Sequence, residues 1–312
     1  MRSWILALLC MWGGFVQAGP PPVPAEVIAL IGGSSLVAAD QSGHLETLLV
    51  LRDPLHRRTL RSFAWEGDTV FSRPRPLNFP GLAQQLAQHR VGLVLIQFGQ
   101  MESLAGSEFL GEFRDAYTRF VTGVQQTVPR ILLLTPTPFG AAGPIDAPTA
   151  RDRNRVLAAY VQSILEIGRT LHVPVIDLFG ELTGPDLKPF EATLDGVQLT
   201  SPGHIEVARI VARRDLGSPA EQLPVLPESA SDAAMLDRVR EAVVHKNRLW
   251  SRYWRPTNWA FLAGDRTEQP SSRDHRDRTI RWFPKEMEEF VPLIESADAE
   301  IRRRATTGEA AR

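Results

Sequence analysis

The sequence is poor in cysteine and carries almost no net charge. Its one cysteine among 312 residues, Cys10, lies in the first apolar segment, where we interpret it as apolar filler. Beyond that segment the chain has no thiol, which excludes disulfides and cysteine metal sites and suits an oxidising compartment. The formal net charge is −1 and no basic block occurs, so neither nucleic acid nor an anionic membrane surface is an expected partner.

The sequence also lacks the short motifs of cofactor-binding proteins. Its seven histidines are scattered, with no pair at metal-ligand spacing, so we expect no metal site. No Gly-x-x-x-x-Gly-Lys loop occurs, and no Gly-x-Gly-x-x-Gly follows the first predicted strand. We therefore expect no cofactor.

What the chain does have begins with an apolar N-terminal segment. Residues 1–18 are typical of a signal peptide, with Arg2, an apolar stretch from Trp4 to Val16, and a small-residue cleavage site ending at Ala18. The stretch is short for a bilayer span, which makes an uncleaved anchor the weaker alternative. We expect an exported protein, periplasmic or extracellular, without a stable membrane span after cleavage.

Strands and helices alternate through the next part of the chain. Strands are predicted at Glu26–Ile31, Arg58–Trp65, Val91–Phe98, Ile131–Thr135 and Val173–Leu178, and several of them are continuous apolar runs. Helices are predicted after Ser34 and over Gly81–Arg90, Ser107–Thr127, Asp152–Leu171 and Ser201–Arg214. This pattern favours an α/β fold, a doubly wound parallel sheet covered on both faces, over residues 25–217.

The remaining sequence changes character. A Pro-rich linker is predicted at 218–229 and a helical, partly disordered extension at 230–312, with helices over Asp232–Trp250 and Pro284–Arg304. The aromatic segment from Trp254 to Phe261 could be a sugar-stacking platform. We favour the interpretation that it packs the extension onto the sheet domain.

A serine follows the first predicted strand. Gly32 and Gly33 precede Ser34, which places this hydroxyl where parallel sheets carry their chemistry. Leu36 stands where the Gly-x-Ser-x-Gly elbow of another hydrolase class would need its last glycine, which excludes that elbow.

Four short motifs now fall into a recognisable order. They are Gly32-Gly33-Ser34, Gly67-Asp68-Thr69, Gly99-Gln100-Met101-Glu102 and Asp195-Gly196-Val197-Gln198. In this order the α/β part resembles the SGNH, or GDSL-type, hydrolase family, and the resemblance implies a flavodoxin-like three-layer fold. The Lys246-Asn247 and Trp254–Asn258 segments resemble, more loosely, the C-terminal extension of secreted family members.

The resemblance assigns roles to three retained residues. Ser34 matches the nucleophile, Gly67 a backbone donor of the oxyanion hole, and Asp195 the acid that orients the catalytic histidine. The family's chemistry needs a nucleophile, a base oriented by an acid, and oxyanion donors. Serine attacks an ester only when a base takes its proton and donors hold the resulting oxyanion.

Three positions depart from the family pattern. Gly33 replaces the first-motif aspartate, Met101 replaces the oxyanion asparagine, and Gln198 replaces the catalytic histidine. Methionine donates no hydrogen bond and glutamine does not titrate. Losing one oxyanion donor costs about 10²–10³ in rate, and losing the triad histidine costs on the order of 10⁶.

The sequence therefore predicts a pseudo-hydrolase whose cleft binds an acylated or carbohydrate-type ligand, a small-molecule or polysaccharide ester. The alternative is an active serine esterase that uses Ser34 with an atypical base. Candidate bases are His44, His204, Glu66 and Glu102; we expect packing or polar contacts for the histidines and solvation for the carboxylates. Ser35 would be the nucleophile if the register were shifted by one residue.

Overall fold

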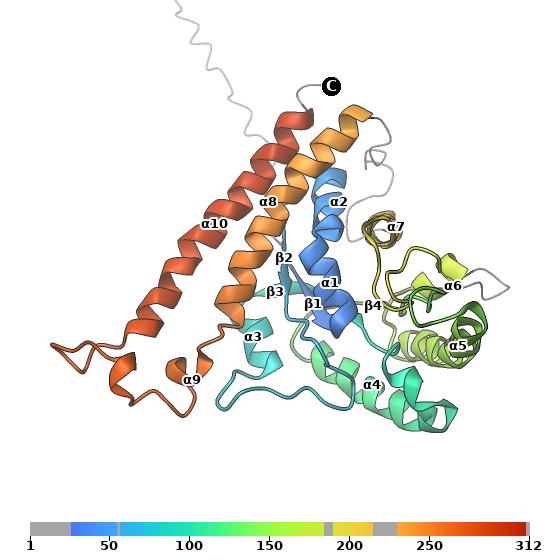
Figure 1. The fold of residues 1–312 in the computed structure, drawn as a ribbon, viewed down its shortest axis with the longest axis horizontal. Coiled ribbons are helices and arrows are strands. Elements are labelled where there is room, and N and C mark those ends of the chain that lie inside the picture. Colours follow the sequence, from blue (N-terminus) through green and yellow to red (C-terminus); the bar gives the residue numbers. More distant parts are fainter. Residues whose placement is uncertain (1–25, 55–56, 184–189, 215–229, 310–312) are drawn as a thin grey trace, which may run out of the picture.

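The computed structural model describes residues 26–54, 57–183, 190–214 and 230–309. The predicted signal peptide, Cys10 and the predicted linker at 218–229 lie outside the described residues. Figure 1 shows a sheet wrapped by helices, with two long C-terminal helices standing side by side along one edge.

The sheet has five parallel strands in the order β2-β1-β3-β4-β5. They are β1 (Glu26–Gly32), β2 (Arg58–Ser62), β3 (Val91–Gln97), β4 (Arg130–Leu134) and β5 (Val175–Ile176). The predicted α/β class and doubly wound parallel sheet are confirmed. Two predicted strands are too long, because the second ends at Ser62 rather than Trp65 and the last has only two residues.

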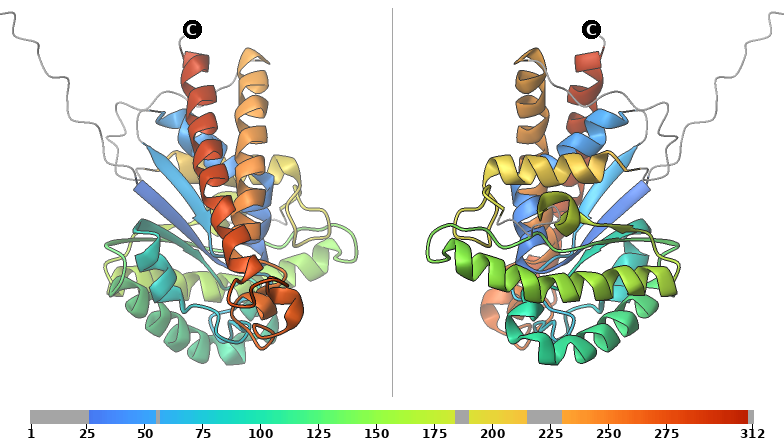
Figure 2. Two further views of the ribbon diagram at one scale, coloured as in Figure 1. Left: turned by 90° about the vertical axis from the view of Figure 1, so that its left-hand side faces the viewer. Right: turned by 90° about the vertical axis from the view of Figure 1, so that its right-hand side faces the viewer.

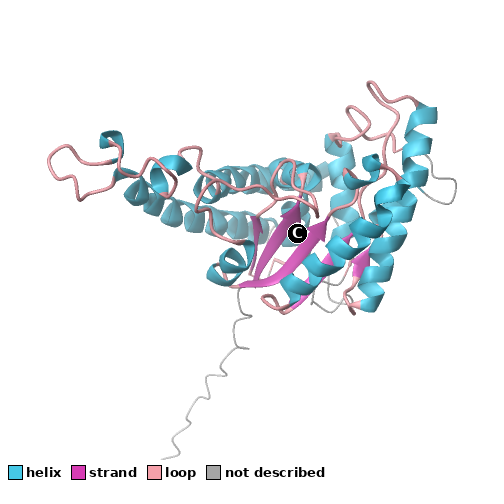
Figure 3. Cartoon of the chain, turned by 90° about the horizontal axis from the view of Figure 1, so that it is seen from below, coloured by secondary structure: helices cyan, strands magenta, loops and turns pink. Residues whose placement is uncertain are grey.

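Alternation along β1 shows how both faces of the sheet are buried. Ile28 and Leu30 face one apolar core, and Ala29 and Ile31 face another. Successive side chains of a strand point to opposite faces, so an unbroken apolar run serves two cores at once. Helices lie on both sides of the strands (Figure 3).

The helices of the sheet domain divide between these two cores. Those on the Ile28 face are α1 (Ser34–Ser42), α2 (His44–Arg52) and α7 (Ser201–Ala212). Those on the other face are α3 (Leu82–Gln88), α4 (Leu110–Gln125) and α5 (Ala147–Thr170). A short α6 (Leu178–Thr183) follows β5. Figure 2 shows α4 and α5 together below the sheet.

The helix predicted after Ser34 is two helices. Gly43 has φ +74° and its N–H closes α1 by donating to the carbonyls of Ala39 and Asp40. Glycine adopts this left-handed conformation without steric cost, which ends one helix and lets the next start in a new direction. A Cβ on Gly43 would also come within 2.8 Å of Val244, so another helix packs closely here.

The predicted start of α5 is wrong by about one turn. The Asp146 side chain accepts a hydrogen bond from the Thr149 N–H at 2.8 Å, and Pro148 stands in the first turn. A capping aspartate followed by proline is a typical helix start. The helix therefore begins at Ala147 rather than Asp152.

The C-terminal extension forms α8 (Ala230–Trp254), α9 (Trp259–Leu262) and α10 (Trp282–Glu309). Helices α8 and α10 run antiparallel (Figure 1) and, with α2, enclose a third apolar core of Val50, Val239, Val243, Ile301 and Ala305. Within the described ranges, no helix combines the length and apolar character needed to cross a bilayer.

Aromatic contacts fix the extension to the sheet domain. Trp254 packs edge-on against Phe63 and Trp65, and Trp259 packs against Phe79. The Trp250 indole N–H donates to the Ser62 carbonyl at 2.8 Å. These contacts confirm the packing interpretation of Trp254 and Trp259.

Candidate active site

The first motif lies at the carboxyl edge of the sheet. Gly32, the last residue of β1, is the register neighbour of Gln97, the last residue of β3. Gly33 is the extended N-cap of α1 and Ser34 is its first residue, exposed to solvent. In the described part of the chain, no residue forms a hydrogen bond with the Ser34 hydroxyl.

The second motif contacts the first. The Trp65 N–H donates to the Gly32 carbonyl at 3.1 Å, and a Cβ on Gly33 would lie 2.7 Å from the Asp68 carbonyl oxygen. An aspartate at position 33, as in the family pattern, would need the backbone around Asp68 to move. The glycine at position 33 therefore allows an unusually close approach of the two turns, because it has no Cβ.

The backbone N–H groups of Gly67 and Ser34 have no acceptor among the described residues at this edge. Gly67, at φ +80°, and Ser34, at the start of α1, each have an N–H that bonds to no described residue. The first N–H groups of a helix lack partners within the helix and favour negative charge. Both groups are thus suited to hold a carbonyl oxygen, the role that the sequence predicts for Gly67.

The turn that carries Gly67 is held by an ion pair between buried Asp68 and partly exposed Arg75. Asp68 is 4% exposed and accepts two hydrogen bonds from the Arg75 guanidinium, at 2.7 and 2.6 Å. The guanidinium also stacks on Trp65, with 4.5 Å between its carbon and the ring centroid. Paired charge-assisted hydrogen bonds of this kind hold a geometry firmly.

In the third motif, Met101 is 49% exposed and donates nothing to the site. Glu102 is buried, and its two carboxylate oxygens accept from the N–H groups of Gly99 at 2.8 Å and Val70 at 2.9 Å. Burial raises the pKa of Glu102, against the opposing effect of these backbone hydrogen bonds. The expected solvation of Glu102 is therefore wrong, since the carboxylate ties the second motif to the third.

Gln100 ties the third motif to its neighbours. Its amide donates to the Thr137 carbonyl at 2.8 Å, in the loop after β4, and its Oε1 accepts from the Ser35 hydroxyl at 3.4 Å. Sequence reasoning missed this residue, because Gln100 occupies the variable position of the motif. A polar residue just past a buried strand was the only available signal.

The fourth motif forms a turn against the loop after β4. Asp195 Oδ1 accepts from the N–H groups of Val197 at 2.9 Å and Gln198 at 2.7 Å, and Gly140 donates to the Gly196 carbonyl at 2.8 Å. The Gln198 side chain is exposed and bonds to none of the described residues. Asp195 keeps Oδ2 for another partner, and position 198 supplies no imidazole.

The candidate bases have other neighbours. His44 Nε2 lies 3.0 Å from the Ser201 hydroxyl, and burial, aided by Arg240, lowers the pKa of His44 to about 4. His204 lines a small cavity of about 20 Å³ with Ser35, and burial lowers its pKa too.

Glu66, as expected, is partly solvated. It pairs with Arg255, whose hydrogen bond holds the pKa of Glu66 below its usual range. A carboxylate with a depressed pKa is a weaker base. Among the described residues, neither carboxylate nor histidine forms a hydrogen bond with Ser34.

The model of the GDSL-like Lipase/Acylhydrolase family matches residues 33–204, more than half of the chain. The chain belongs to this family. The family prediction, drawn from four motifs in order, is confirmed. No curated protein matches the chain.

Solved structures resemble this GDSL-family chain at low sequence identity. A gut microbial diltiazem-metabolizing enzyme is 9% identical with a TM-score of 0.60, over 91% of this chain and 96% of its own, so the shared fold includes the C-terminal helices. A catalytic mutant of Axe2, an acetylxylan esterase from Geobacillus stearothermophilus, is 18% identical with a TM-score of 0.48, over 64% and 98%. The lipase/acylhydrolase from Enterococcus faecalis is 18% identical with a TM-score of 0.44, over 66% and 100%.

Proposed function

We propose that this GDSL-family protein is an exported pseudo-hydrolase, whose cleft at Ser34 binds an acylated or carbohydrate-type ligand with little turnover. Export is proposed from the N-terminal segment, residues 1–18. The observation that carries the proposal is Gln198 at the position of the family's base. An amide cannot take the serine proton, so the step that forms the nucleophile is missing.

Binding does not need that step. The N–H groups of Ser34 and Gly67, which bond to no described residue, can still donate to an ester carbonyl oxygen, and Ser34 is open to solvent. Backbone donors and binding alone leave roughly 10³-fold acceleration over water in hydrolases stripped of their triad. We therefore expect a ligand to be held and cleaved only slowly.

An active esterase with an atypical base is the second candidate. It is favoured by one observation, that His204 and Ser35 line the same small cavity. With Ser35 as nucleophile, the His204 imidazole would have to reach its hydroxyl to act as the base. Ser35 currently donates to Gln100 instead.

Hydrolysis of p-nitrophenyl acetate by the full chain separates the two candidates. For a pseudo-hydrolase, the wild-type chain and Ser34→Ala should hydrolyse the ester at rates within about tenfold of each other. Ser35→Ala is the matched control, one residue away on the same helix. Brisk turnover that Ser34→Ala or Ser35→Ala abolishes would overturn the proposal and identify the nucleophile.

Restoring the missing groups tests whether the cleft still holds a substrate. Gln198→His with Met101→Asn supplies a base three residues from Asp195 and a third oxyanion donor. We expect the rate of ester hydrolysis to increase at least about 10²-fold, which is the usual contribution of one oxyanion donor to the rate. No increase, in a variant that melts at the wild-type temperature, would contradict a preserved ester-binding cleft.

A further inference from the structure

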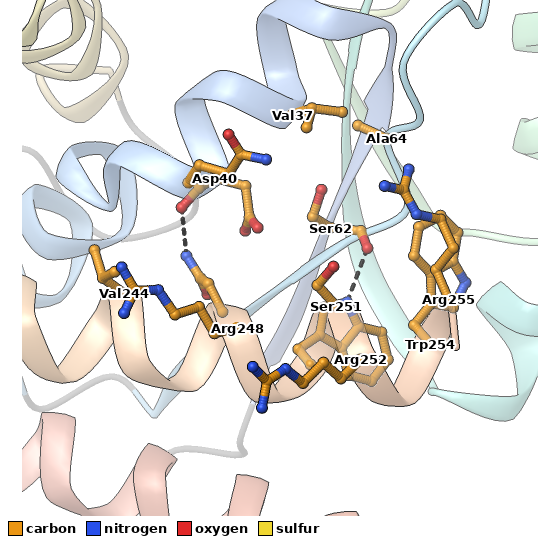
Figure 4. A pocket seen from close by; sticks show the side chains of 13 residues that line it. Val37, Asp40, Ser62, Ala64, Val244, Arg248, Ser251, Arg252, Trp254 and Arg255 are labelled. Atoms are coloured by element: carbon orange, nitrogen blue, oxygen red, sulfur yellow. Dashed lines mark hydrogen bonds between the residues drawn. The ribbon is translucent and has the colours of Figure 1, made fainter. Parts of the chain in front are cut away.

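A second cavity, of about 370 Å³, lies between α1 and α8 beside the end of β2 (Figure 4). Val37, Asp40 and Gln41 line it from one face of α1, and Asn247 and Trp250 line it from α8. Its lining includes none of the four motifs of the candidate active site. The volume falls within the range of about 300–1,000 Å³ that small-molecule sites occupy.

Two residues that line this cavity each carry a buried acceptor oxygen without a hydrogen bond to any described residue. Asn247 is 4% exposed; its amide nitrogen donates to the Asp40 carbonyl at 2.7 Å, while its Oδ1 bonds to nothing among the described residues. Asp40 Oδ1 is likewise buried without a hydrogen bond to any described residue. Buried polar atoms are nearly always hydrogen-bonded, so two unpaired acceptors on one cavity indicate a site for a donor.

The surroundings favour hydroxyl groups over an ammonium group as that donor. Burial raises the pKa of Asp40 to about 7, with Glu46 adding to the rise and Lys246 and Arg61 opposing it. Near neutral pH the carboxyl group is thus present in both forms, and a hydroxyl can donate to one and accept from the other. An ammonium group can only donate, so it would suit the ionised form of the carboxyl group alone.

The exposed side of the cavity is cationic. Arg248 and Arg252 stand one turn apart on α8 and are exposed, and neither forms an ion pair with a described residue. Arg255, by contrast, is held by Glu66 and lies over Trp65. Free guanidinium groups recognise planar carboxylates.

The tryptophans complete the lining. Trp250 and Trp254 have their indole N–H groups bonded to Ser62 and Gln85, so what they add to the cavity is apolar ring surface. The cavity thus has groups that can bond to hydroxyls inside, apolar rings beside them and guanidinium groups at its exposed side. This arrangement is complementary to a sugar that carries an acid group.

We propose that the cavity between α1 and α8 binds a sugar acid, a monosaccharide unit whose hydroxyls bond to Asp40 and Asn247 and whose carboxylate meets Arg248 and Arg252. No covalent step is involved. The site is separate from the cleft at Ser34, so this proposal does not depend on the proposed function.

Calorimetric titration of the full chain at pH 7 tests the proposal, with D-glucuronate, D-glucose and acetate as probes. We expect one saturable site for glucuronate, binding about tenfold weaker for glucose, and none for acetate. Asp40→Leu, close to aspartate in size, should abolish binding of both sugars. The double change Arg248→Ala with Arg252→Ala should reduce glucuronate to the affinity of glucose and leave glucose unchanged.

Arg238→Ala is the matched control, an exposed arginine earlier on α8 that does not line the cavity. It should bind glucuronate as the wild-type chain does. The proposal is overturned if the wild-type chain shows no saturable binding of glucuronate, or if binding survives Asp40→Leu in a variant with a wild-type melting curve. It is equally overturned if the exposed arginine changes, which leave the buried core intact, do not weaken glucuronate binding.

Discussion

Replacing Lys246 by methionine should strongly destabilise the protein, because this lysine forms a fully buried ion pair between the extension and the sheet domain. Lys246 on α8 is fully buried, and its ammonium group donates to Glu46 at 2.7 Å and to the Leu60 carbonyl at 2.9 Å. Glu46 on α2 is 2% exposed. Lys246→Met fills a similar volume but leaves a buried carboxylate without its counter-charge.

Removing one partner of a buried ion pair costs about 3–5 kcal/mol, a large share of the 5–15 kcal/mol that typically stabilises a protein. Replacing both partners is far milder, because no charge is then left buried. Urea denaturation followed by far-ultraviolet circular dichroism should therefore show a loss of about 3–5 kcal/mol for Lys246→Met and a substantial recovery for Lys246→Met with Glu46→Leu. Lys285→Met, on the exposed face of α10, is the control and should change stability by no more than about 0.5 kcal/mol.

The loss should also depend on pH in a defined direction. Burial raises the pKa of Glu46, and Lys246 opposes that rise. Without the lysine, the folded state holds a proton that the unfolded state releases, so the stability of Lys246→Met falls as pH rises above the ordinary glutamate pKa and recovers as pH falls. A loss below about 1 kcal/mol, or a double variant no more stable than the single one, would refute the reasoning.

Three further outcomes follow from single contacts. Gly33→Ala should lower the free energy of unfolding in urea by about 1–3 kcal/mol, because its Cβ would lie 2.7 Å from the Asp68 carbonyl oxygen. An unchanged denaturation midpoint would show that the backbone around Asp68 moves away at no cost. Glu102→Leu should cost about 1–3 kcal/mol for each of the two backbone N–H groups that it leaves unpaired, measured in the same way, whereas the exposed Met101→Leu should cost little. Because the pKa of Asp40 is raised from 3.8 to about 7, its contribution to stability should decline as pH rises through that interval; Asp40→Leu should remove this slope from thermal melts recorded at several pH values, and an unchanged slope would contradict it.

The sheet was predictable from the sequence because its signals are local. Nearly all-apolar runs such as Val91–Phe98 predict a strand that two cores must cover, and glycines or prolines mark where such runs stop. The end of β2 was not predictable in this way. Residues beyond Ser62 remain apolar because Phe63 and Trp65 pack against α8 and neighbouring loops, and that contact comes from a helix nearly 190 positions away.

The site was predictable only as a set of motifs. Family resemblance located Ser34, Gly67, Met101, Asp195 and Gln198, and their roles remain predictions. Burial of Glu102 and the orphaned oxygens of Asp40 and Asn247 are consequences of long-range packing that no local pattern reports. A carboxylate on a loop is ordinarily solvated, so Glu102 departs from the default for a reason visible only in three dimensions.

Most of the retained motif residues have a structural task that needs no catalysis. Asp195 caps its own turn, Glu102 joins two loops through backbone N–H groups, and Gly67 adopts a positive φ. These contacts account for the three residues without assigning any of them a role in catalysis. Ser34 differs, because its hydroxyl is exposed and makes no hydrogen bond with any described residue, so no contact of the fold accounts for it. The Ser34 hydroxyl and the N–H of Gly67 are thus the groups that contacts within the described residues do not account for, so substitutions at Ser34 test the proposed function more directly than those at Asp195.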